Sequence, residues 1–183
     1  MSRIWPYVFG MTDITTRREP IRSRPLLPDG YGVPETDAGM VEWSWATEQL
    51  AQSRNYWFCT TRPDGRPHAM PAWAVWLDDA LYFDGSPETR RGRNLAHNPA
   101  ISVHLESGDH VVVLEGDALE AGKPSPELAQ KLVATFEQKY AASHDYHPTA
   151  DQWDSGGLWV LRPRVAFGWR DFPNSLTRWR FAS

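Results

Sequence analysis

The sequence contains a single cysteine and no long apolar run. Because Cys59 has no second cysteine to pair with, no intrachain disulfide can form. No stretch approaches the roughly 20 consecutive apolar residues that a membrane-spanning helix needs. The first residues also lack the basic-then-apolar order of a signal peptide. We therefore expect a globular protein of the cytoplasm that is neither held by disulfides nor embedded in a membrane.

Several common catalytic signatures are missing as well. The sequence has no Gly-x-Ser-x-Gly nucleophile turn, no Gly-x-Gly-x-x-Gly or Walker loop, and no His-Glu-x-x-His zinc motif. The polar stretch 143–157 comes nearest to a metal site, since it holds His144, His147, Asp151 and Asp154, but without a known ligand spacing. A solvated loop is the favoured interpretation, and no metal is assigned.

Positive charge is not in excess over the whole chain. Lys and Arg number 19 against 23 Asp and Glu, so the net charge of −4 does not predict nucleic-acid binding. The basic residues are nevertheless clustered, at 17–24, 90–93 and 162–180. Ten tryptophans are many for this length; they indicate aromatic-lined pockets or interfaces, with core packing as the alternative.

The spacing of apolar residues predicts a mainly β protein with a few helices. Residues 1–40, rich in proline, are expected to form an extended arm, and residues 41–183 a single domain. The expected helices are 41–54, 86–95 and 125–141. The expected strands are 56–61, 66–77, 80–84, 100–106, 110–120, 158–161, 165–171 and 175–181. Tight turns join most neighbouring strands, which favours an antiparallel barrel over an alternating βαβ sheet.

The segment 86–95 gives the best indication of a binding site. Ser86 is expected to cap a helix that has Pro87 as its first residue. One hydroxyl and three guanidinium groups then gather near the helix start, where free N–H groups favour anions; they belong to Thr89, Arg90, Arg91 and Arg93. Few acidic residues are placed to neutralise these arginines, so phosphate binding is favoured over an ordinary solvated helix face.

The order of elements and the motifs resemble a known family. The segments that carry the resemblance are Thr60–His68, Pro71–Trp76, Leu81–Phe83, Arg93–Leu95, Asn98-Pro99, Ser102–Glu106 and Val113–Gly116. They resemble the pyridoxamine 5′-phosphate oxidase-like split β-barrel superfamily, and more closely its branch of reductases that depend on the deazaflavin coenzyme F-420. The resemblance is strong over about residues 42–120 and more specific for the fold than for the substrate.

The resemblance implies a split antiparallel β-barrel that forms a homodimer, with two cofactor grooves at the subunit interface. Thr89, Arg90 and Arg91 match the element that holds the cofactor phosphate, and Asn94 matches the polar residue that follows it. The strand Pro67–Val75 would line the ring system. Its expected contacts are Met70, Pro71 and Trp73.

The same strand departs from the oxidases proper. Met70 and Val75 stand where those enzymes carry an Arg and a Lys, so oxidation of pyridoxamine phosphate is not expected. Pro71, Trp73 and Trp76 would instead provide an apolar wall for a flat ring. Strand alternation places the two tryptophans on opposite faces, so one is expected to contact a ligand and the other to lie in the core.

Three functions are therefore considered. The first is an oxidoreductase that transfers hydride between coenzyme F-420 and a small apolar or conjugated substrate. The second is a flavin oxidoreductase that binds FMN, and the third a non-enzymatic protein that binds a flavin, haem or tetrapyrrole. His68, Tyr82 and His104 are candidate proton donors, and no catalytic residue is assigned. The expected partners are a small substrate and a second copy of the chain, with neither nucleic acid nor membrane.

Overall fold

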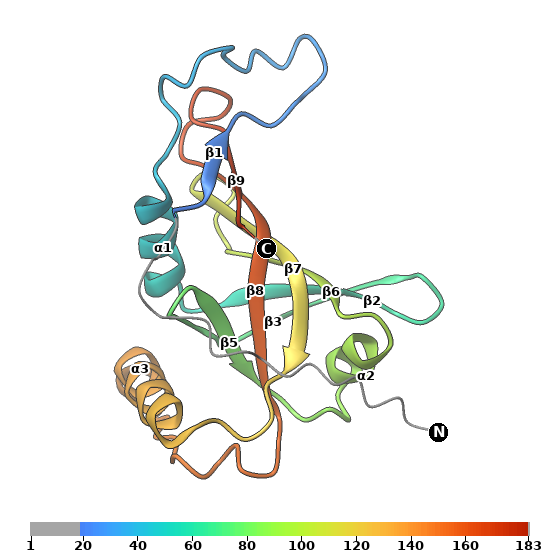
Figure 1. Ribbon diagram of the computed structural model, residues 1–183, viewed down its shortest axis with the longest axis vertical. Coiled ribbons are helices and arrows are strands. Elements are labelled where there is room, and N and C mark those ends of the chain that lie inside the picture. Colours follow the sequence, from blue (N-terminus) through green and yellow to red (C-terminus); the bar gives the residue numbers. More distant parts are fainter. Residues whose placement is uncertain (1–18, 183) are drawn as a thin grey trace.

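Nine strands and three helices make up the computed structural model of the protein, which describes residues 19–182 (Figure 1). The strands are β1 (Ile21–Ser23), β2 (Tyr56–Thr61), β3 (Pro67–Ala72), β4 (Val75–Leu77), β5 (Ala80–Asp84), β6 (Ala100–His104), β7 (Val111–Glu120), β8 (Leu158–Trp169) and β9 (Thr177–Arg180). The helices are α1 (Trp43–Gln52), α2 (Arg90–His97) and α3 (Pro126–His144). The predicted mainly β class with three helices is confirmed.

All strand pairs are antiparallel, and β8 organises them. The main path runs β1-β9-β8-β7-β6-β2-β3, while β4 pairs with β5 and β5 pairs with β8. Along one edge, β8 pairs with the whole of β7. Its other edge is shared, because Leu158–Leu161 pair with β5 and Val165–Gly168 pair with β9. The sheet therefore divides at the middle of β8 and curves around two cores.

The first core fills the inside of the curved sheet. One row of directly opposed residues crosses five strands, and none of its side chains is more than 1% exposed; it consists of Phe58, Val103, Leu114, Ala166 and Trp179. Helix α1 closes this core with Trp43, Ala46 and Leu50, which recur at helical spacing as predicted. Full burial of such side chains contributes roughly 1.5–3 kcal/mol each.

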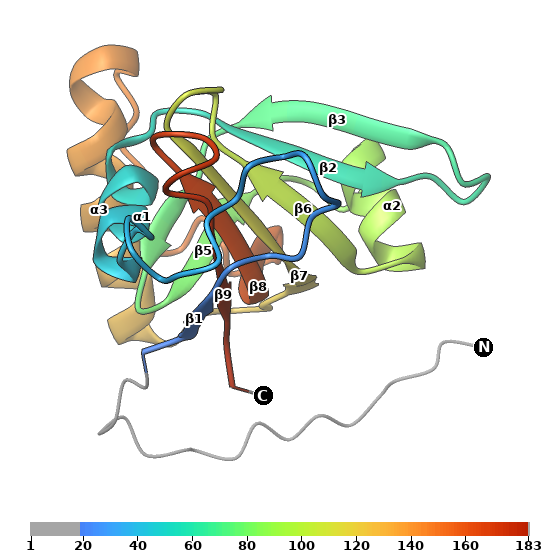
Figure 2. The ribbon, with the colours of Figure 1, turned by 90° about the horizontal axis from the view of Figure 1, so that it is seen from above.

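Helix α3 covers the second core. Ser125 accepts the N–H of Leu128 and Pro126 follows at the first helical position, which confirms the predicted cap. Leu132, Phe136 and Tyr140 pack from this helix onto β4, β5 and the start of β8. Figure 2 shows α1 and α3 on one side of the sheet and α2 on the far side, beside β2, β3 and β6. Within residues 19–182, none of the helices combines the length and apolarity that crossing a bilayer requires.

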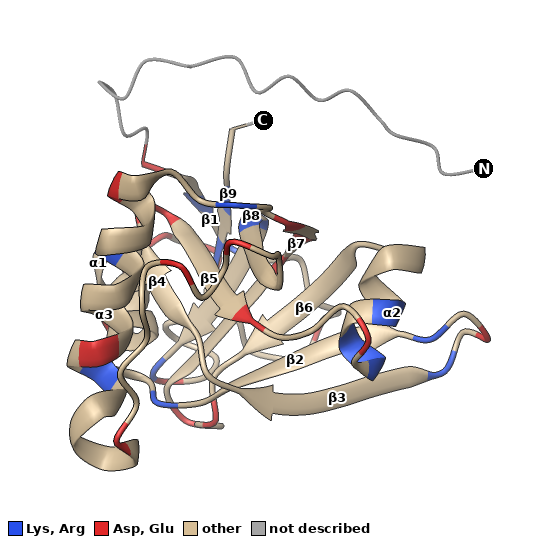
Figure 3. Cartoon of the chain, turned by 90° about the horizontal axis from the view of Figure 1, so that it is seen from below, with Lys and Arg blue, Asp and Glu red and all other residues tan. Residues whose placement is uncertain are grey.

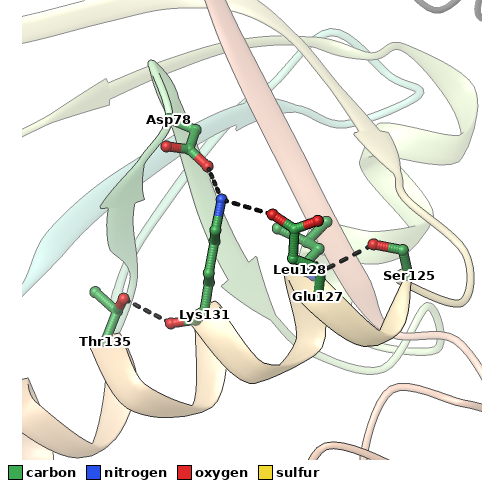
Figure 4. A network of polar contacts seen from close by, with 6 residues as sticks. All are labelled: Asp78, Ser125, Glu127, Leu128, Lys131 and Thr135. Carbon is green, nitrogen blue, oxygen red and sulfur yellow. Dashed lines mark hydrogen bonds and ion pairs between the residues drawn. The ribbon is translucent and has the colours of Figure 1, made fainter. Parts of the chain in front are cut away.

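Polar contacts also fix α3 to the turn between β4 and β5. Lys131 Nζ lies 3.4 Å from Asp78 Oδ2 and 3.2 Å from Glu127 Oε1, one turn earlier in the helix (Figure 4). Exposed ion pairs of this kind contribute little free energy, about 0–1 kcal/mol each. They orient the helix, whereas its apolar face holds it.

Three strands differ from the sequence-based expectation. The strand expected at 66–77 is broken after Ala72, because Trp73 turns away to pack against α3. The strands expected on either side of Pro163 form the single strand β8, since Pro163 lies opposite Gly116, where the register with β7 shifts. The shift leaves the neighbouring Arg164 without a register partner in β7, and a ladder disrupted by such a bulge tolerates a proline. Residues 21–23, inside the expected arm, pair with β9 as β1.

Candidate anion-binding site at helix α2

The basic segment forms helix α2, but the helix begins later than predicted. Thr89, not Ser86, is the N-cap, and its hydroxyl oxygen accepts the N–H of Gly92 at 3.1 Å. The same hydroxyl donates to the carbonyl of Ser86 at 2.8 Å, so its one proton is already engaged. Ser86 and Pro87 belong to the preceding turn. Thr89 therefore shapes the start of the helix from which the arginines project.

Close packing explains the later start. A Cβ atom built on Gly92 would lie 2.5 Å from the carbonyl oxygen of Pro87 and 2.6 Å from its Cα. The turn at residues 86–89 thus passes directly against the first turn of the helix, where only a glycine fits. A helix that began at Pro87 would have to unfold this turn.

Positive charge converges on His68, which lies on β3 next to α2. Burial lowers the pKa of His68 first, and the nearby charges of Arg62, Arg90 and Arg91 lower it further. The imidazole is therefore neutral at neutral pH. Figure 3 shows the same concentration as blue segments on α2 and on the neighbouring β2–β3 hairpin. Among residues 19–182, no carboxylate lies within ion-pair distance of these three arginines.

The arginines contribute in different ways. Arg90 is exposed and its guanidinium is free to meet a ligand. Arg91 is half-buried, with its guanidinium carbon 4.8 Å from the ring centre of Phe58 and 4.9 Å from that of Phe83. Its Nη2 donates to the carbonyl of Asp84 at 2.7 Å. Burial lowers the pKa of Arg91, although it stays charged at neutral pH. Arg91 thus supplies fixed charge, and Arg90 an accessible contact.

Arg62 was missed in the sequence. It follows β2 in the hairpin turn, where its N–H donates to the carbonyl of Arg66 at 2.9 Å. Its Nε is buried and has no hydrogen-bond partner among the described residues. The only acidic residue of the turn, Asp64, is occupied by Arg66 at 2.6 Å. The signal for Arg62 is the hairpin register, which brings this turn back beside His68.

Asn94 lies inside the structure. Its side chain is 0% exposed, and its Nδ2 donates to the hydroxyl of Thr60 at 2.9 Å. The same hydroxyl lies 3.4 Å from Nδ1 of His68. Asn94 therefore links α2 to β2, and through the Thr60 hydroxyl it helps to position His68 on β3. The other amide atom, Oδ1, has no partner in the described part of the chain.

Met70 and Pro71 belong to opposite faces of β3. Met70 is opposed to Phe58 and is 52% exposed, on the same face as His68. Pro71 is opposed to Trp57 on the outer face. Because β3 is an edge strand, Met70 borders the arginine cluster without being covered by another strand. The structure thus brings Met70, but not Pro71, to the same face as His68.

The two tryptophans pack in different cores. Trp73 stacks on Tyr140 at 4.7 Å and meets His144 and Tyr146 edge-on, under α3. Trp76 packs against Trp43 at 5.9 Å, next to the first core. Their opposite placement follows the predicted alternation. Trp73 is half-buried and lies apart from the arginine cluster.

The remaining candidate proton donors lie elsewhere. Tyr82 is 5% exposed in the second core, and burial raises its pKa. His104 is on the outer face of the sheet, where its ring stacks on Trp57 at 6.3 Å. His68 alone adjoins the arginine cluster. In the segment 143–157, His147 is bonded to Glu137 at 2.9 Å, and the described residues contain no group of three metal-ligating side chains.

Comparison with known proteins identifies the fold family. The sequence matches the family model described as pyridoxamine 5′-phosphate oxidase over residues 46–170, well over half of the chain. No curated protein matches the sequence. Among solved structures, the chain is similar to a heme binding protein from Mycobacterium smegmatis, at 22% identity and a TM-score of 0.56, over 78% of this chain and 57% of that chain. It thus spans little more than half the length of that protein.

Two further structures show the same likeness. One is a conserved hypothetical protein from Mycobacterium tuberculosis, at 24% identity and a TM-score of 0.59, over 74% of this chain and 89% of that one. The other is an F420 reductase, at 20% identity and a TM-score of 0.50, over 76% and 98%. Such low identities establish a shared fold and nothing about the ligand. The family match confirms the predicted superfamily, and the antiparallel sheet that divides at β8 agrees with it. The chain therefore belongs to the pyridoxamine 5′-phosphate oxidase family.

Proposed function

We propose that this protein is an oxidoreductase that binds a phosphorylated deazaflavin, coenzyme F-420, between α2 and the β2–β3 hairpin and exchanges hydride with a small apolar or conjugated substrate. FMN is the alternative cofactor. The observation that carries the proposal is the convergence of Arg62, Arg90 and Arg91 on His68 without an acidic partner at ion-pair distance. The cytoplasm, where such a cofactor is dissolved, is the compartment we propose.

The residues present fit the phosphate end of such a cofactor. Three guanidinium groups that repel one another are stabilised when an anion lies among them, and guanidinium binds phosphate oxygens in pairs. The unpaired Nε of Arg62 is a buried donor that a phosphate oxygen would satisfy. Arg90 and Arg62 would hold the phosphate directly, and Arg91 would add its fixed charge.

The edge strand β3 suits the ring end. Met70 is half exposed beside His68, so an apolar ring laid there would cover its side chain. Bound in that place, a reduced deazaflavin would supply the hydride. His68 is neutral, and in that state its imidazole both donates and accepts hydrogen bonds. It is the group we assign to orient the ring or to hold a proton near the acceptor.

Binding of F-420 and FMN to the purified protein tests the proposal. We expect F-420 to quench tryptophan fluorescence with higher affinity than FMN. Arg90→Ala and Arg62→Ala should each weaken F-420 binding by about 1.5–3 kcal/mol, the value of a hydrogen bond to a charged group. Arg90 is the better test than Arg91, because Arg91 also packs on Phe58 and Phe83 and its loss would disturb the core.

The matched control is Arg164→Ala. Arg164 is exposed on β8 and lies 3.5 Å from Asp117, apart from α2. This variant should bind F-420 like the wild type. If Arg90→Ala and Arg164→Ala bind equally well, the anion site is not at α2. If FMN binds more tightly than F-420, the alternative cofactor is the right one.

Haem binding is the second candidate function. The specific observation is again His68, whose lowered pKa keeps the imidazole in the neutral form that ligates iron. Titration with hemin distinguishes the two: a Soret band that is lost in His68→Ala supports haem, and its absence supports the nucleotide-type cofactor.

We further propose that the working form is a homodimer. The outer face of the sheet carries a row of half-buried side chains across five strands: Pro71 at its exposed edge, then Trp57, His104, Val113 and Phe167. An antiparallel sheet with one solvated face normally has polar residues there. A second copy would cover this row, and the row ends at the edge strand β3, next to the proposed cofactor site.

A further inference from the structure

A hollow lies beside the turn that leads into α2. Its volume is about 660 Å³, and its walls come from residues 84–87, Tyr146 and the segment 152–157. None of the arginines that converge on His68 lines it. The hollow is therefore separate from the proposed cofactor site, although both touch Asp84.

Asp84 faces both sites with different atoms. Its backbone carbonyl accepts Nη2 of Arg91 at 2.7 Å. Its carboxylate oxygen Oδ2 accepts the hydroxyl of Tyr146 at 3.1 Å and lies 3.5 Å from the amide nitrogen of Gln152. Tyr146 and Gln152 both line the hollow. The carboxylate thus belongs to the hollow and the carbonyl to the arginine side.

The charge of Asp84 is not neutralised by an ion pair. The lining contains this one carboxylate and no Lys, Arg or His. No cationic side chain among residues 19–182 lies within ion-pair distance of its carboxylate. A carboxylate has room for about four hydrogen bonds, and neutral donors take only part of that capacity. Asp84 is therefore the one charged side chain in the wall of the hollow, although the charge of Arg91, behind that wall, also interacts with it.

Aromatic side chains form the rest of the wall. Tyr146 is half-buried and Trp153 is 1% exposed, and both line the hollow. The indole N–H of Trp153 has no partner among the described residues. Aromatic rings beside a carboxylate attract organic cations through the ring quadrupole as well as by charge. Gly156, at φ +98°, leaves the rim without a side chain.

We propose that this hollow binds a small organic cation, an ammonium or amidinium group on an apolar body, with Asp84 as its counter-ion and Tyr146 and Trp153 as its walls. Inorganic and organic phosphates would be repelled by the same carboxylate. The proposal requires no cofactor and goes beyond the redox function. It assigns to the protein a second ligand that differs in charge from the first.

Three probes that share one ring test the proposal on the full chain. Benzylamine, benzyl alcohol and benzoate differ only in the charge of the substituent, and calorimetry gives their affinities. We expect benzylamine to bind at least about tenfold more tightly than benzoate, with benzyl alcohol between them. The indole N–H signal of Trp153, identified by its loss in Trp153→Phe, should shift with benzylamine. Equal affinities for the three probes would overturn the proposal.

Two variants locate the site. Asp84→Asn keeps the shape of the side chain and should weaken benzylamine binding at least about tenfold. Tyr146→Phe keeps the ring and the carboxylate and should change it less than twofold. Benzylamine binding that is unchanged in Asp84→Asn would show that Asp84 is not the counter-ion.

A further variant separates this proposal from the cofactor. Arg90→Ala should weaken F-420 and leave benzylamine unchanged. Benzylamine binding that falls in Arg90→Ala as far as in Asp84→Asn would place the amine at α2 and overturn the second site. Normal benzylamine binding in a protein that binds no F-420 would leave the second site standing and refute only the cofactor.

Discussion

Lys139, on α3, is half-buried, and its ammonium group points toward β2 and the segment before β4. Its Nζ donates to the hydroxyl of Tyr56 at 2.6 Å and to the carbonyl of Ala74 at 3.2 Å. The ring centre of Tyr56 lies 4.6 Å away. Burial lowers the pKa of Lys139 from 10.5 to about 7. The folded protein therefore releases the Lys139 proton near pH 7, whereas the unfolded chain keeps it until the pH approaches 10.5.

The lowered pKa of Lys139 makes the free energy of unfolding increase with pH. Between pH 7 and 10.5 the unfolded chain binds more protons at Lys139 than the folded protein does, so folded stability rises with pH in this window. In Lys139→Met this slope should be absent. Both Tyr56 and Ala74 keep other partners, since Tyr56 donates to the carbonyl of Leu50 and Tyr140 donates to that of Ala74.

Urea unfolding at pH 6.5, 7.5 and 8.5 measures the effect. The free energy of unfolding of the wild type should gain on that of Lys139→Met by at most about 1.4 kcal/mol per pH unit. Lys123→Met is the control, because Lys123 is exposed and its ion pair with Asp154 lies on the surface. Parallel pH curves for the wild type and Lys139→Met would contradict the lowered pKa.

Some contacts of individual residues could be predicted from the sequence, and others could not. Arg90 and Arg91 were predicted as site residues because their neighbours in the chain are basic. Arg62 was not, because its place beside His68 depends on a hairpin register, and its role depends on Asp64 being occupied by Arg66. The stacking of Trp73 on Tyr140 likewise joins residues far apart in the chain. Such pairings have no local signal.

Among the elements, helix α2 depends on the absence of a side chain at Gly92. An alanine is normally a better helix residue than glycine by about 1 kcal/mol. Here its Cβ would lie 2.5 Å from the backbone of Pro87, which has no flexible end to move aside. We expect Gly92→Ala to destabilise the protein by about 1–3 kcal/mol and to weaken F-420 binding, because the turn and Arg90 must shift.

Thermal unfolding and F-420 titration of the same samples give both quantities. Ala96→Gly, at an exposed position of α2, should cost only the helix propensity, roughly 1 kcal/mol, and leave binding intact. A Gly92→Ala protein that is more stable than the wild type would mean that the turn at 86–89 does not pack against the helix as described.

Local signals predicted one helix start and failed at another that looked the same. Ser125-Pro126 caps α3 as expected, and the Ser125 hydroxyl oxygen accepts the N–H of Leu128. Ser86-Pro87 shows the same pair of residues, yet the helix begins at Arg90. The difference is the contact between Pro87 and Gly92, which the sequence does not reveal. Strand order was predictable because most connections are tight turns.

At the scale of the whole molecule, the half-buried outer face leads to a prediction about assembly. If a second copy covers Trp57, His104, Val113 and Phe167, a charge placed among them should separate the copies. Val113→Glu should therefore be monomeric at concentrations where the wild type is dimeric, as measured by sedimentation equilibrium. A stable dimer typically buries about 800 Å² on each copy, and one buried carboxylate is enough to disfavour it.

Ala134→Glu is the control, since Ala134 is exposed on α3, away from this face. It should sediment like the wild type. A wild-type protein that is monomeric at every concentration, or a Val113→Glu protein that stays dimeric, would show that the row on the outer face is not the interface.

The shared strand β8 has a consequence for synthesis in the cell. Strands β5, β7 and β9 all pair with it, but β8 begins only at Leu158. While the ribosome is still translating earlier codons, one edge of β5 and one edge of β7 have no partner strand. Unpaired edges of this kind aggregate or recruit chaperones. A premature stop codon before β8 should therefore yield a chain that proteases remove, whereas the completed chain can close its sheet on release.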